Sequence, residues 1–107
     1  MKYPRPTDLG HAPVWENYII AQAVQASLGL IPENALAVGV EVAEREVRLQ
    51  FQLTRVAEQD EADMRDIVSE LEDLVGPDIK VEAAHEVRAW RAISPHDGVC
   101  WIYLKRA

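Results

Sequence analysis

Hydrophobic residues near the start of the chain recur at the spacing of an α-helix. Between Val14 and Leu28 they follow one another at three- and four-residue steps, and Pro13 stands where a first helical residue would. Gly29 and Pro32 then end the pattern, because glycine favours a helix C-terminus and proline prevents the helix from resuming. The predicted helix is apolar around much of its circumference, so we expect it to be deeply packed or shared with another chain.

From Leu36 onward the period changes to two, which is typical of half-buried β-strands. Two alternating stretches, 36–43 and 46–53, flank Glu44 and Arg45 and therefore predict an antiparallel hairpin. A two-residue connection specifies its register. In that register one face pairs Val42 with Val47, Val40 with Leu49 and Val38 with Phe51, and the other face pairs Glu41 with Arg48.

The helical period returns in the next segment and then gives way to two further strands. Apolar residues recur at three- and four-residue steps up to Val75, and Gly76-Pro77 closes this amphipathic helix. Residues 79–89 alternate again, with His85 on the apolar side, and predict a third strand. Residues 99–105 are apolar on both faces, so we expect the last strand to be central in the sheet or covered on both sides.

This order of elements predicts an α+β fold. The elements read α-β-β-α-β-β, and short connections favour a four-stranded, mainly antiparallel sheet with two helices packed on one face. A chain of 107 residues suits one domain, which we assign to residues 13–107. Residues 1–12 contain two prolines and a glycine without periodicity and are interpreted as an irregular N-terminal arm.

The composition narrows the cellular setting. Cys100 is the single cysteine, so no intrachain disulfide can form, and its apolar neighbours predict a packed thiol. The first residues lack the apolar core of a signal peptide, and no apolar run approaches the roughly 20 residues that span a bilayer. We therefore expect a cytoplasmic protein that does not insert into a membrane.

Charge is distributed very unevenly along the chain. The net charge is −7, and residues 58–73 carry eight acids and one arginine, so this segment alone accounts for the whole excess. Such a surface repels nucleic acid and anionic membranes and attracts cationic partners, although a solvated helix face that keeps a protein soluble can look similar. Like charges at helical neighbours each cost about 0.2 to 0.5 kcal/mol, a repulsion that a cationic partner would relieve. We expect the contacts with a basic protein to come from Asp60, Glu61, Asp63, Asp66, Glu70 and Asp73.

Large aromatic residues gather near the C-terminus. Trp90, Trp101 and Tyr103 suit plain core packing, but they also suit an exposed apolar patch. If Trp101 and Tyr103 share the sheet face that carries the small residue Gly39, that patch could join two copies of the chain or anchor a partner. We name Trp90 and Trp101 as candidate apolar anchors.

No motif for catalysis, metal binding or phosphate binding stands out. The histidines lack the local spacing of a zinc site, and no calcium loop is present, so we predict no metal and no cofactor. The sequence favours a protein without catalytic activity. An enzyme or small-molecule-binding protein would need a pocket between helices and sheet, built from scattered residues such as His85, Cys100 and Tyr103.

One local pattern carries a resemblance. The stretch Leu28-Gly29-Leu30-Ile31-Pro32, followed by an alternating hairpin and an acidic helix, resembles small uncharacterised bacterial proteins, some of which are immunity partners of toxins. The resemblance implies a non-catalytic acidic protein that occupies the site of a basic toxin such as a nuclease. It carries over no individual functional residue.

The leading hypothesis is therefore a non-catalytic interaction module, of immunity or inhibitor type, that presents its acidic helix to a basic protein. A homodimeric structural domain, joined through the sheet face or the first helix, is the alternative. A small-molecule-binding protein or enzyme is the third.

Overall fold

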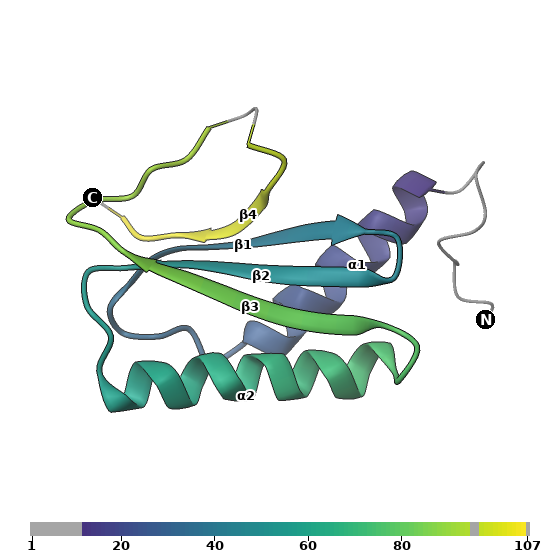
Figure 1. Cartoon of the computed structure of the whole chain (residues 1–107), viewed down its shortest axis with the longest axis horizontal. Coiled ribbons are helices and arrows are strands. Elements are labelled where there is room, and N and C mark those ends of the chain that lie inside the picture. Colours follow the sequence, from purple (N-terminus) through teal and green to yellow (C-terminus); the bar gives the residue numbers. More distant parts are fainter. Residues whose placement is uncertain (1–11, 95–96, 107) are drawn as a thin grey trace.

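The computed structural model describes residues 12–94 and 97–106, and the elements in these ranges follow the predicted order (Figure 1). The arm predicted for residues 1–12 lies outside the described residues apart from Ala12, which begins the first helix. The elements are α1 (Ala12–Ser27), β1 (Ala35–Ala43), β2 (Glu46–Leu53), α2 (Glu58–Val75), β3 (Lys80–Val87) and β4 (Cys100–Leu104). The predicted α+β class is confirmed.

Within the described residues the strands form one mixed sheet in the order β3-β2-β1-β4. β1 is antiparallel to both β2 and β4, so the sheet is mainly antiparallel as predicted. β3, however, runs parallel to β2. The reason is the connection between them, because α2 carries the chain back along the sheet before β3 begins.

The hairpin of β1 and β2 has the predicted register. Every predicted pair is present, including Val38 with Phe51 and Glu41 with Arg48. The side chains of this last pair nevertheless turn to other partners, because Glu41 accepts a hydrogen bond from Gln50 at 3.2 Å while Arg48 lies 3.6 Å from Glu82 of β3. The hairpin turn is also tied to α1, whose Trp15 indole donates to the carbonyl of Glu44 at 2.8 Å.

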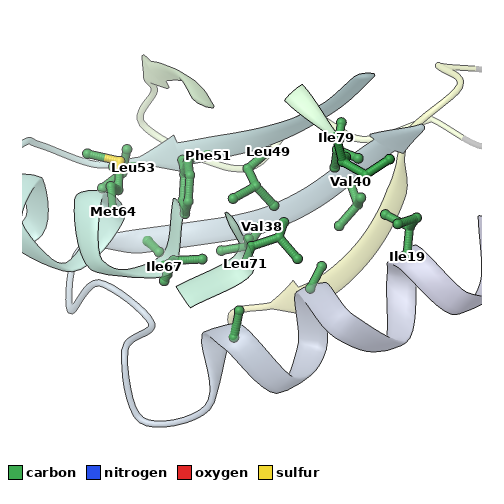
Figure 2. Packing of buried hydrophobic residues seen from close by; sticks show 14 of the residues in the cluster. Ile19, Val38, Val40, Leu49, Phe51, Leu53, Met64, Ile67, Leu71 and Ile79 are labelled. Atoms are coloured by element: carbon green, nitrogen blue, oxygen red, sulfur yellow. The ribbon is translucent and has the colours of Figure 1, made fainter. Parts of the chain in front are cut away.

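Both helices cover the same face of the sheet, as predicted, and the core lies between the two layers (Figure 2). α1 contributes Trp15, Ile19, Ala23 and Ala26, α2 contributes Met64, Ile67 and Leu71, and the facing strand residues are Val38, Val40, Val47, Leu49, Phe51 and Leu53. α1 is not buried all round, since Leu28 just beyond its end is 64% exposed and Val24 is also exposed. The expectation of a deeply packed first helix therefore holds for one side of it.

β4 corrects two sequence-based expectations. It is an edge strand of the described sheet, so the central placement is wrong, and of the two expected alternatives only contact on both faces is found. A β-bulge opposite Val38 and Gly39 also sends Trp101 and Tyr103 to opposite faces, so they do not form a shared patch. Tyr103 packs against the core, whereas Trp101 lies over Gly39 on the other face. The doubly apolar pattern of this strand thus reflects contacts on both faces at the edge of the sheet.

Candidate partner-binding surfaces

Four acids share the outer side of α2. Asp63, Asp66, Glu70 and Asp73 follow one another at three- and four-residue steps, and we call this set the acidic surface of α2. Asp66, Glu70 and Asp73 are exposed, and Asp63 is half-buried and accepts a hydrogen bond from Gln59 at 2.8 Å. None of the four forms an ion pair with a described residue. Their negative charges therefore add up to a negative potential at this surface.

Asp60 does not belong to that surface. Its side chain is 1% exposed, which corrects the expectation that it contacts a partner. Its Oδ2 accepts hydrogen bonds from the backbone N–H of Ala57 at 2.8 Å and from the side-chain amide of Asn34 at 2.7 Å. Asp60 therefore satisfies a backbone group at the start of α2 and joins this helix to the segment before β1.

The surroundings of Asp60 also alter its acidity. Burial by itself would raise the pKa of the carboxyl group, but hydrogen bonds from the Asn34 side chain and from the backbone of Ala57 and Asn34 lower it. The positive charge of Arg55 adds to this effect, and the resulting pKa lies below the usual value of 3.8. Asp60 is thus held as a buried, fully hydrogen-bonded carboxylate.

Glu61 lies on a different side of α2, along a groove between this helix and β3. The groove has a volume of about 580 Å³ and is lined by Met64, Arg65 and Val68 as well as Glu61 and Glu72 from α2, and by Ala83, Ala84 and His85 from β3. Its lining combines apolar side chains with the charged side chains of Glu61, Arg65 and Glu72. The sequence did not indicate this groove, because the relative placement of α2 and β3 depends on the parallel crossover.

The two candidate tryptophan anchors differ in exposure. Trp90 follows β3 and is 74% exposed, which makes it the most exposed large apolar side chain among the described residues. Trp101 is half-buried, and its indole N–H donates to Asp97 at 3.0 Å. Trp90 is therefore available to a partner, whereas Trp101 already has a structural role.

Residues 88–94, which follow β3, fold back over the open face of the sheet. Gln52 of β2 is buried and bonds Ala92 twice, donating to its carbonyl at 2.6 Å and accepting from its N–H at 2.8 Å. Asp97 accepts hydrogen bonds from the backbone N–H groups of Ser94 and Val99, which lower the pKa of its carboxyl group. A space of about 260 Å³ remains under this segment, with Glu41, Glu86 and Asp97 among its lining residues.

The residues considered for a small-molecule site are not brought together. His85 lies on β3, whereas Cys100 and Tyr103 lie on β4 at the opposite edge of the sheet. Cys100 is exposed, which corrects the expectation of a packed thiol. Within the described part of the chain, no group of three or more His, Cys, Asp or Glu side chains is arranged to hold a metal ion.

None of the helices in the described ranges combines the length and the apolar character needed to cross a membrane. No protein-family model matches the chain, and no curated protein matches it either.

Proposed function

We propose that this chain is a non-catalytic protein–protein interaction module that presents the acidic surface of α2 to a cationic protein. The observation that carries the proposal is that none of these four carboxylates forms an ion pair with a described residue. The ion pairs among the described residues lie instead around β2 and β3, between Arg48, Lys80 or Arg88 and the acids Glu82 and Glu86. A cationic surface would relieve the repulsion within α2 and would be drawn to it over several ångströms.

Electrostatics of this kind acts mainly on the rate of association. Exposed charges steer the encounter, and the effect weakens as salt screens it. A buried apolar contact acts instead on dissociation, and Trp90 is the exposed side chain best suited to supply it. The two kinds of contact can therefore be separated by kinetics.

The resemblance to immunity proteins suggests one specific form of this function. In that form the partner is a basic toxin or enzyme, and the acidic surface of α2 covers its cationic site. Inhibition of the captured partner would then accompany binding.

The test begins with affinity capture from a lysate of the source organism at low salt, followed by purification of the captured protein. Association rates are then measured with wild type and with two charge-matched variants. The first replaces Asp66, Glu70 and Asp73 by Lys. The second replaces Glu16, Glu33 and Glu44 by Lys. These three are exposed acids outside α2. Both variants change the net charge equally, so only the location of the change differs.

The α2 variant should associate about tenfold or more slowly at low salt, and the difference should shrink as salt is added. The matched variant should behave much more like wild type. Trp90→Ala should mainly raise the dissociation rate. Equal slowing of both charge variants would show that net charge, not the acidic surface of α2, controls association, and the proposal would be rejected.

A further inference from the structure

β3 leaves one of its backbone edges open. In the described sheet it pairs only with β2, and the N–H groups of Lys80 and Arg88 donate to Arg45 and Leu53 at the two ends of this ladder. In a parallel ladder the residues that bond the neighbouring strand alternate, so the even-numbered residues of β3 face β2. The N–H and C=O groups of the odd-numbered residues therefore point outward, and no described residue bonds them.

The side chains beside this edge leave room for another strand. The odd-numbered residues of β3 project toward the helices, where Ala83 and His85 line the groove next to Met64 and Val68. Ala83 and His85 are exposed, and Val87 is 60% exposed although it belongs to the same apolar row. A strand added along β3, the outermost strand on the side of α2 (Figure 1), would place its own small and apolar side chains over this groove.

The charges of β3 are complementary to a second, antiparallel copy of β3. If Ala83 lies opposite Ala83 of the second copy, Lys80 lies opposite Glu86, and Asp78 lies opposite Arg88. A shift of two residues in one direction sets Glu82 against Glu86, and a shift in the other direction sets Glu82 against itself. Shifts of one residue are excluded, because they would exchange the two faces of the sheet.

We propose that the chain forms a symmetric homodimer in which the two β3 strands pair in antiparallel orientation, centred on Ala83. The two sheets then become continuous, and the outward backbone groups of Val81, Ala83 and His85 bond their counterparts. Lys80 and Glu86 form pairs across the dimer axis on the open face of the sheet. This interface differs from a dimer joined through the sheet face or through the first helix, which are the two forms that the sequence suggests.

The dimer is independent of the function proposed above. The groove beside β3 is lined from α2 by residues such as Glu61, Arg65 and Glu72, whereas the acidic surface lies on another side of the same helix. Both surfaces can therefore be occupied at once. Loss of one interaction leaves the other to be measured by itself.

The test is sedimentation equilibrium over a wide range of protein concentration, with charge variants of β3. Lys80→Glu and Glu86→Lys each set like charges against each other and should weaken the dimer about tenfold. The double variant should dimerise like wild type. An equimolar mixture of the two single variants should form a heterodimer, because every cross-strand charge pair is then restored.

Matched controls separate this interface from effects on the fold. Lys105→Glu makes the same change of charge as Lys80→Glu, but just after β4, at the opposite edge of the sheet. It should therefore leave the dimer intact. Ala83→Pro removes an outward N–H that β2 does not use, so it should abolish the dimer while circular dichroism shows a folded chain. If Ala83→Pro unfolds the chain, the charge variants still test whether the two β3 strands pair.

Wild type that is monomeric at all concentrations would overturn the proposal. So would a dimer that is insensitive to both charge variants, or single variants that fail to form a heterodimer when mixed.

Discussion

Asp60 and Asn34 are joined by a hydrogen bond of 2.7 Å between the side-chain amide of Asn34 and Oδ2 of Asp60. Asn34 stands just before β1, and its backbone carbonyl accepts a hydrogen bond from Thr54 just after β2. Asp60 also accepts a hydrogen bond from the backbone N–H of Ala57 at the start of α2. One buried carboxylate therefore connects the hairpin to the helix that follows it.

Asp60→Ala should destabilise the fold by about 1 to 3 kcal/mol, because it removes a helix-start contact and leaves the half-buried side-chain amide of Asn34 without its carboxylate partner. Urea denaturation would measure the change. Asp66→Ala, which removes an exposed carboxylate of the same helix, should stay within about 0.5 kcal/mol of wild type. An equally small effect at Asp60 would contradict the connecting role.

Stability should also depend on pH through Asp60. Its pKa in the folded state lies below the usual value of 3.8, so the unfolded chain takes up the proton first as pH falls. The contribution of Asp60 is therefore complete above about pH 4 and is lost as pH falls toward the lower folded-state pKa. The difference in unfolding free energy between wild type and Asp60→Asn should shrink in that acidic range. A difference that is constant with pH would argue against it, since Asp97 and Glu82 titrate alike in both proteins.

Gly39→Ala should loosen the packing of β4. An added Cβ would lie within 3.0 Å of side-chain carbons of Val99 and Trp101, so one of these must move. We expect the free energy of unfolding to fall by about 1 to 3 kcal/mol. The Trp101 indole N–H signal should also shift in NMR spectra, because its hydrogen bond to Asp97 is disturbed. Ala43→Val, at an exposed position on the same face of β1, serves as the control and should leave that signal in place.

Glu44→Gly should stabilise the hairpin. Glu44 has a φ of 55° and is the one described non-glycine residue with positive φ, a conformation that strains a side chain. Glycine removes the strain but loses more backbone entropy on folding. The free energy of unfolding, measured by thermal unfolding, should therefore rise by about 0.5 to 1 kcal/mol. Arg45→Gly in the same turn brings only the entropic cost and should lower stability. Similar effects of the two variants would rule out strain at Glu44.

The hairpin shows why part of the fold was predictable. Two requirements, an apolar face and a two-residue connection, both selected the register that pairs Val40 with Leu49, and the structure has it. The helices were predictable for a similar reason, since periodicity depends on neighbours along the chain. Information of this kind is local.

The candidate sites were predictable only in part. The charge of α2 is visible in the sequence, but the burial of Asp60 is not, because its partner Asn34 lies 26 residues away. The positions of Trp101 and Tyr103 depended on a bulge, which alternation alone could not reveal. His85 and Cys100 could not be placed until the strand order was known.

The sequence by itself determined the elements, the hairpin register and the concentration of charge on α2, because each of these depends on residues that are close along the chain. Only the tertiary structure decided which strands form the edges, which acid is buried and where the groove beside β3 lies. Those features arise from contacts between distant segments. The parallel crossover through α2 brings together surfaces that no local pattern describes, and the open edge of β3 is its consequence.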